Sequence, residues 1–137
     1  MKGIAIAVML ALAAGGAAAE QLGVYYMELG PEDYRNSSGA GLTDPGTILQ
    51  QDRANFHRFG IRHSGDESDR FFGDRAARAQ IPALFRAGRP DEYALNVLKG
   101  PYPGWNGQYA VFICGTAGRV THLWVDPADG DGYRGCD

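Results

Sequence analysis

The densest group of chemically active side chains lies between residues 50 and 59, in a segment with helical periodicity. Arg53 and His57 are four residues apart, so they share one face of a helix and are candidates for contacting a ligand or partner. Asp52 and His57 are five residues apart and diverge by about 140° on a regular helix, so they need a residue from another element to act together. We predict that these polar residues form a solvated helix face. The alternative is a small secreted hydrolase built on Asp52 and His57.

No hydrolase or zinc motif accompanies this helix in the sequence. The chain contains no Gly-x-Ser-x-Gly sequence, which positions the nucleophile of many hydrolases. The three histidines, His57, His63 and His122, form no His-x-x-x-His or His-Glu-x-x-His pattern, and a zinc site needs three or four convergent ligands. We therefore predict no resident cofactor, apart from calcium bound weakly at the C-terminus.

Candidate calcium ligands lie in the acidic C-terminal tail. Asp126, Asp129 and Asp131 precede Gly132, and an Asp-x-Asp-Gly run supplies the oxygen atoms and the tight turn that calcium prefers. The EF-hand template does not fit, because aligning Gly132 with its turn glycine places Pro127 at the first ligand position. A weak calcium-binding module is therefore one interpretation of the tail.

Residues 129–137 are also similar to the end of the extracellular calcium-binding region called Excalibur, which closes on Asp-Gly-Asp-Gly followed by Cys and an acid. The resemblance covers nine residues, and nothing upstream matches. It departs from that pattern by one inserted residue and by Asp137 in place of the usual Glu. It implies a calcium site in the tail. The alternative is a polar turn that brings Cys136 back to Cys114.

The N-terminus predicts export. Lys2 is followed by an unbroken apolar stretch over residues 4–14, and Ala17-Ala18-Ala19 supplies the small-x-small pattern that signal peptidase recognises. We expect residues 1–19 to be a cleaved signal peptide. The mature protein would be periplasmic or secreted, with no membrane attachment after cleavage.

Residues 20–137 are expected to form a single globular domain stapled by a disulfide. Cys114 and Cys136 are the only cysteines, and an even number of cysteines in an oxidising compartment predicts a bridge. The bridge would tie the end of the chain to an apolar strand.

The order of the predicted elements indicates the fold class. Residues 24–29 read as a strand, and residues 108–114 and 119–125 read as two strands of a hairpin with a four-residue loop. Helices are expected between them, over residues 45–59, over about 75–86 with a break at Pro82, and over about 91–98. The fold class is therefore α+β: a small antiparallel sheet of about three strands, the N-terminal strand plus the C-terminal hairpin, with two to three helices packed on it.

Four aromatic residues have contrasting predicted roles. Phe59 belongs to an apolar helix stripe and Tyr93 to the last helix, and both are expected to pack in the core. Tyr102 and Trp105 lie on a loop rich in proline and glycine, where aromatic rings are candidate contacts for a partner or a sugar. The alternative for Trp105 is a lid on the hydrophobic core.

Composition and charge indicate one globular domain and argue against nucleic-acid binding. The 137 residues are 45% hydrophobic and 21% charged, which is typical of one globular domain. Residues 52–89 contain eight arginines and five acids, but the arginines are scattered along the expected helices and do not cluster into a basic strip with interleaved aromatic residues, so nucleic-acid binding is not expected. The leading interpretation is a small exported, non-catalytic protein that binds or modulates an unidentified protein or small molecule.

Overall fold

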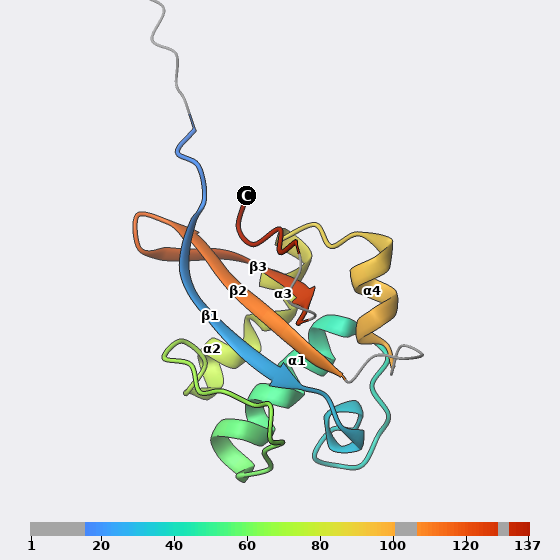
Figure 1. The fold of residues 1–137 in the computed structure, drawn as a ribbon. Coiled ribbons are helices and arrows are strands. Elements are labelled where there is room, and N and C mark those ends of the chain that lie inside the picture. The colour runs from blue at the N-terminus through green and yellow to red at the C-terminus, as the bar shows by residue number, and fades with distance from the viewer. Residues whose placement is uncertain (1–15, 101–106, 129–131) are drawn as a thin grey trace, which may run out of the picture.

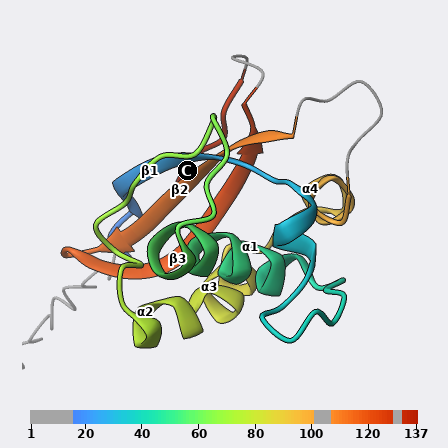
Figure 2. The same cartoon turned by 90° about the horizontal axis from the view of Figure 1, so that it is seen from below.

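The computed structural model describes residues 16–100, 107–128 and 132–137, and it confirms the predicted α+β class. The strands β1 (Glu20–Glu28), β2 (Gln108–Thr116) and β3 (Arg119–Pro127) form one antiparallel sheet in the order β1-β2-β3. The helices lie mainly on one face of this sheet, as the two ribbon views show (Figures 1 and 2).

The hairpin between β2 and β3 is tighter than predicted. Gly115 and Thr116 continue β2, so the loop contains only Ala117 and Gly118 rather than four residues. Both loop residues have positive φ, 51° and 73°, as a two-residue type I′ turn requires. The pairing shifts register between Cys114 and Gly115, which marks a bulge close to the turn.

The first long helix begins as predicted and then changes its pitch. Asp44 caps α1 (Pro45–Ala54), and its carboxylate accepts a hydrogen bond from the Thr47 N–H at 2.9 Å. The chain continues into η2 (Asn55–Phe59), a π-helical turn that ends at Gly60 with φ 66°. The described residues also contain a short 3-10 helix, η1 (Pro31–Tyr34).

Two aromatic residues do not face the core, so those two predictions are wrong. A π-helical turn takes more residues per turn than an α-helix, so Phe59 is rotated away from the apolar stripe and is 43% exposed. Tyr93 is 51% exposed, because its neighbour Ala94 is the residue that faces inward at that turn.

The second predicted helix is two helices, separated where proline was expected to break it. They are α2 (Arg75–Ala79) and α3 (Ile81–Ala87), with Pro82 in the first turn of α3. With α4 (Glu92–Leu98), the part of the chain that the structure describes has four α-helices. Within that part, none of the helices has the length and apolar character needed to cross a bilayer.

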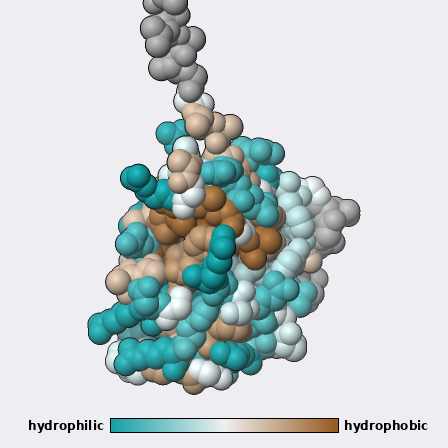
Figure 3. Space-filling model, turned by 90° about the vertical axis from the view of Figure 1, so that its left-hand side faces the viewer, coloured by the Kyte–Doolittle hydropathy of each residue, from teal (hydrophilic) through white to brown (hydrophobic). Residues whose placement is uncertain are grey.

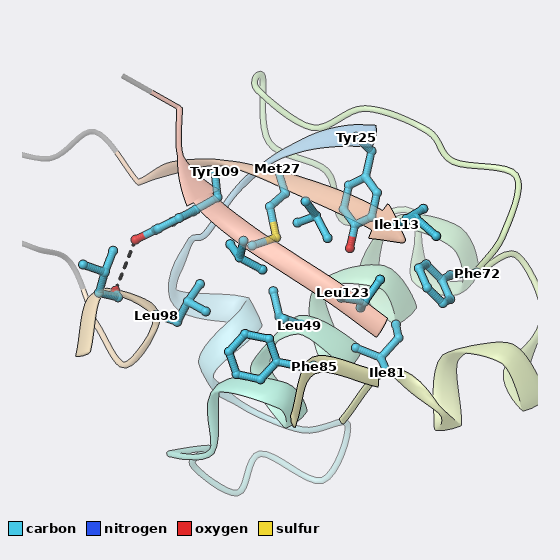
Figure 4. Close-up of a cluster of buried hydrophobic side chains, with 13 residues drawn as sticks. Tyr25, Met27, Leu49, Phe72, Ile81, Phe85, Leu98, Tyr109, Ile113 and Leu123 are labelled. Atoms are coloured by element: carbon cyan, nitrogen blue, oxygen red, sulfur yellow. Dashed lines mark hydrogen bonds between the residues drawn. The ribbon is translucent and has the colours of Figure 1, made fainter. Parts of the chain in front are cut away.

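The main core lies between the sheet and the helices (Figure 4). Alternate strand residues, such as Tyr25 and Met27 of β1, point from the sheet toward the helices and meet Leu49 and Phe85. The Tyr109 hydroxyl donates a hydrogen bond to the Val97 carbonyl at 3.2 Å. The sheet therefore supplies a rigid base for the helices and loops.

The opposite face of the sheet is covered by the C-terminal tail. The predicted disulfide between Cys114 and Cys136 is confirmed, and it joins β2 to residues 132–137. Tyr133 packs on Phe112, with ring centroids 5.6 Å apart. The tail therefore buries an apolar strand face that would otherwise meet water.

Candidate functional site

Three polar residues of α1 and η2 are buried, so the prediction that this polar face is solvated is wrong for them. Asp52, Arg53 and Asn55 are 1%, 0% and 3% exposed. They are covered because residues 62–72 fold back between this helix and the edge of β1, where the Glu67 N–H donates to the Tyr26 carbonyl at 2.8 Å. The helix therefore presents its charged side chains to other protein groups.

Arg53 is the centre of this buried network. Its Nε donates to Asp52 Oδ2 at 2.7 Å, and its Nη1 donates to Asp69 Oδ2 at 3.1 Å and to the Glu67 carbonyl at 2.8 Å. The guanidinium stacks on the Tyr25 ring, 4.1 Å from its centroid. Arg53 therefore joins α1, residues 67–69 and β1, and it is too enclosed to contact a ligand.

His57 pairs with Asp69 and not with Asp52. His57 Nε2 lies 2.9 Å from Asp69 Oδ2, and Asp69 Oδ1 accepts hydrogen bonds from the N–H groups of Phe71 and Phe72. Burial would raise the pKa of Asp69, but the hydrogen bonds from His57, Phe72 and Arg53 outweigh it and lower this pKa. Among the described residues, no serine, threonine or cysteine side chain is hydrogen-bonded to His57.

A second histidine, His63, lies among three carboxylates, an arrangement that residue spacing did not indicate. His63 Nδ1 is 3.6 Å from Asp33 Oδ2 and 3.4 Å from Asp66 Oδ2, while its Nε2 is 3.2 Å from Glu32 Oε2. Partial burial lowers the pKa of His63, but the Glu32 hydrogen bond and the nearby charges of Asp33 and Asp66 outweigh it, so the net shift is upward. An imidazolium at this place links η1 to residues 63–66.

Two buried aspartates of this region have raised pKa values. Burial raises the pKa of Asp33, and it raises the pKa of Asp52 to about 7 although the neighbouring Arg53 opposes the shift. In the described part of the chain, no three His, Cys, Asp or Glu side chains are arranged to hold a metal ion. The hydrogen bonds of the network connect α1 with η1, through Asn55 and Asp33, and with residues 67–69, through Arg53.

An open cleft adjoins this network, between η1 and the α1–η2 helix. Its volume is about 530 Å³. At its floor, Asn55 donates from Nδ2 to Asp33 Oδ1 at 2.9 Å and accepts from Gln51 Nε2 at 2.9 Å. Phe59 and Ile61 form an apolar rim and are 43% and 39% exposed. The complete lining consists of Glu32, Arg35, Asn36, Ser37, Gly39, Gln51, Asn55, Phe59 and Ile61.

The loop that forms the opposite wall of the cleft is held by its own turn. Asn36 Oδ1 accepts hydrogen bonds from the Ser38 N–H at 3.0 Å, the Ser38 hydroxyl at 2.7 Å and the Ala40 N–H at 2.9 Å. The Leu42 N–H donates to the Tyr34 carbonyl at 2.8 Å and closes the base of the loop. The glycine and serine residues of this segment predicted a loop. They did not predict that the loop lies against α1, because that contact joins residues far apart in the sequence.

A second apolar surface lies beside β1 (Figure 3). A shallow groove of about 230 Å³ is lined there by Leu22, Val24, Phe71 and Ile113, and the Arg70 guanidinium lies 5.0 Å from the centroid of the Phe71 ring.

The remaining candidate residues are not brought into the cleft. Asp126 holds the C-terminal tail, since its Oδ1 accepts from Trp124 Nε1 at 2.8 Å and its Oδ2 accepts from the Gly135 N–H at 3.3 Å. The predicted partner contacts Tyr102 and Trp105 lie outside the described residues, as do the predicted calcium ligands Asp129 and Asp131. Most of the predicted signal peptide, residues 1–15, also lies outside them.

Comparison with known proteins finds no significant match among family models, curated proteins or solved structures.

Proposed function

We propose that this protein is a small exported binding protein that holds its ligand in the cleft beside Asn55 and does not catalyse a reaction. The supporting observation is the contrast between the floor and the rim of the cleft. At the floor, the side-chain amide of Asn55 accepts a hydrogen bond from Gln51 and donates one to Asp33. At the rim, Phe59 and Ile61 are exposed. A preorganised polar floor with an apolar rim favours binding, because little conformational entropy is lost when the ligand arrives.

The contacts of the acidic and basic groups favour binding over hydrolysis. Arg53 links Asp52 to Asp69, and His57 is hydrogen-bonded to Asp69. A hydrolase that used His57 to activate a side-chain nucleophile would need that nucleophile within hydrogen-bonding reach of the ring, and among the described residues no serine, threonine or cysteine side chain is hydrogen-bonded to His57. The carboxylates instead hold α1 against β1 and against residues 66–72.

Export is part of the proposal. The disulfide between Cys114 and Cys136 supports an oxidising compartment, because such bridges persist mainly in exported proteins. The signal-peptide pattern of residues 1–19 points to the same location.

Titration of ¹⁵N-labelled protein tests whether the cleft binds. The probes are an acidic pentapeptide, a neutral pentapeptide and diacetylchitobiose. We expect at least one probe to shift the amide signals of residues 36–39, 51, 55 and 59–61. Phe59→Ala should weaken binding of that probe about threefold or more, because it removes the largest exposed apolar group of the rim.

Val24→Ala is the matched control, because Val24 is 39% exposed and lies on β1, outside the cleft. Equal weakening by Val24→Ala and Phe59→Ala would contradict the proposal. So would a titration in which no probe moves the cleft amides.

A further inference from the structure

The cleft continues into a second hollow with a different chemical character. This hollow has a volume of about 140 Å³, and it shares Ser37, Gln51 and Phe59 with the cleft. Its lining includes the exposed residues Arg58 and Arg75, and the buried Arg78, whose Nη1 donates to the Phe72 and Gly73 carbonyls. The two hollows therefore form one extended groove that passes Phe59.

The exposed arginines along this groove form no ion pairs with carboxylates of the described residues. Arg35 lines the cleft, Arg58 and Arg75 line the second hollow, and all three are exposed. Within the described residues, none of the three has a carboxylate at ion-pair distance. Glu32, the one acid of the cleft lining, is 3.2 Å from His63 Nε2, so its charge is partly neutralised.

The positive surface follows from where the acids of the same region lie. Three of the five acids between residues 52 and 89 are Asp52, Asp66 and Asp69, and their side chains are 1%, 1% and 2% exposed. These carboxylates contact groups inside the protein: the side chains of Arg53, His57 and His63, and backbone N–H groups. The arginines left on the surface therefore face a groove with little negative charge of its own.

From this arrangement we infer that the groove binds an acidic peptide segment of a partner protein, with an apolar residue between its carboxylates. The inference rests on the proposed binding function and assigns the class of ligand. Guanidinium groups pair with carboxylates through two parallel hydrogen bonds, and arginine clusters recognise acidic motifs in this way. Phe59 lines both hollows and offers an apolar contact shared by them.

Other ligands fit these observations less well. A single inorganic anion would occupy one hollow and leave the apolar rim of Phe59 and Ile61 exposed. A neutral saccharide would leave the guanidiniums without charged partners. An extended acidic peptide satisfies both features of the groove, because its side chains can alternate between carboxylate and apolar groups.

Fluorescence anisotropy with two labelled peptides tests the inference. One peptide has the sequence Glu-Glu-Phe-Glu-Glu, and the other has Gln in place of every Glu. We expect the acidic peptide to bind about tenfold more tightly than the neutral one, and its affinity to fall as salt is raised. Arg58→Gln and Arg75→Gln should each weaken the acidic peptide about threefold, as expected for exposed ion pairs.

Arg86→Gln is the control, because Arg86 is exposed on α3 and lines neither hollow. Its affinity for the acidic peptide should match that of the wild type. Circular dichroism of each variant checks that the fold is kept.

Two results would overturn the inference. Equal binding of both peptides, with no effect of Arg58→Gln or Arg75→Gln, would exclude an acidic partner while leaving the proposed binding function intact. Binding of diacetylchitobiose or of anionic lipid vesicles, with neither peptide bound, would exclude a peptide ligand.

Discussion

Arg53 is the largest of the fully buried side chains, and it is charged. Its environment consists of two aspartates, a backbone carbonyl and the faces of the Tyr25 and Phe56 rings. Burying a charge is costly unless it is paired, so the aspartates and the arginine depend on one another. Removing the arginine leaves two carboxylates inside the protein without their counter-ion.

We predict that Arg53→Met lowers the free energy of unfolding by about 3–5 kcal/mol, the cost of breaking a buried ion pair by removing one partner. Urea unfolding measures the change. Arg86→Met removes an exposed arginine and should change stability by less than about 0.5 kcal/mol. Similar midpoints for the two variants would mean that the buried network contributes little to stability.

His63 makes stability depend on pH. Its pKa is raised in the folded protein by Glu32, Asp33 and Asp66 against the opposing effect of burial, so the folded state binds the proton more tightly than the unfolded chain. The stabilisation is complete below the unfolded pKa of about 6.5 and is lost as the pH rises through the folded pKa. The pKa of Asp52 is also raised in the folded protein, to about 7, so this group likewise makes the free energy of unfolding fall as the pH rises, beginning at lower pH.

We therefore predict that the free energy of unfolding falls between about pH 5 and pH 8, and that His63→Gln flattens the upper part of this decrease. Urea titrations at several pH values measure the slope. His122→Gln is a control of opposite sign, because burial and Arg134 lower the pKa of His122. A slope that stays the same in His63→Gln would contradict this account.

At the scale of elements, the β2–β3 hairpin contains a residue that does not suit its backbone. Ala117 has φ 51°, in the left-handed region that disfavours most side chains but that asparagine and glycine adopt readily. Gly118 follows with φ 73°, so an Asn-Gly pair would match the type I′ turn. The hairpin therefore folds with some backbone strain at Ala117.

We predict that Ala117→Asn raises the free energy of unfolding by about 0.5–1 kcal/mol, because asparagine tolerates this conformation. Chemical denaturation monitored by circular dichroism gives the difference. Ala40→Asn, in an exposed loop position without positive φ, should be neutral. A destabilised Ala117→Asn would show that the turn geometry is not the limiting feature of this hairpin.

In the whole molecule, both faces of the sheet are covered, and a disulfide anchors the segment that covers one of them. The helices cover one face through the main core, and the tail covers the other through Tyr133, Arg134 and the disulfide. Arg134 lies over the Trp124 ring, 3.8 Å from its centroid. Opening the Cys114–Cys136 bridge releases the segment that makes these contacts.

We predict that Cys136→Ser lowers the free energy of unfolding by about 2–4 kcal/mol, as expected for a bridge that closes a loop of this size. Differential scanning calorimetry measures the loss. The double variant with Cys114→Ser should lose little more than the less stable single variant, since one bond is broken only once. Additive losses, or a Cys136→Ser variant as stable as the wild type, would contradict the structural role of the bridge.

The local features of this protein were predictable from residue order along the chain. Asp44, Asp74 and Asp91 directly precede α1, α2 and α4, and each accepts a hydrogen bond from the N–H three residues later. The break before Pro82, the three strands and the pairing of the only two cysteines were also predictable. These features depend on neighbouring residues, on strand periodicity or on the cysteine count, all of which can be read along the chain.

The partners and the burial of the site residues depend on contacts between segments that are far apart in the sequence. The partners of His57 and His63 lie 12 and 31 residues away in sequence, at Asp69 and Glu32, and no periodicity connects them. The π-helical turn that exposes Phe59 leaves no signature in residue spacing either. Charge burial and cleft formation depend on which segments fold back onto which elements, so Asp52, Arg53 and Asn55 are buried although their helix was predicted to have a solvated polar face.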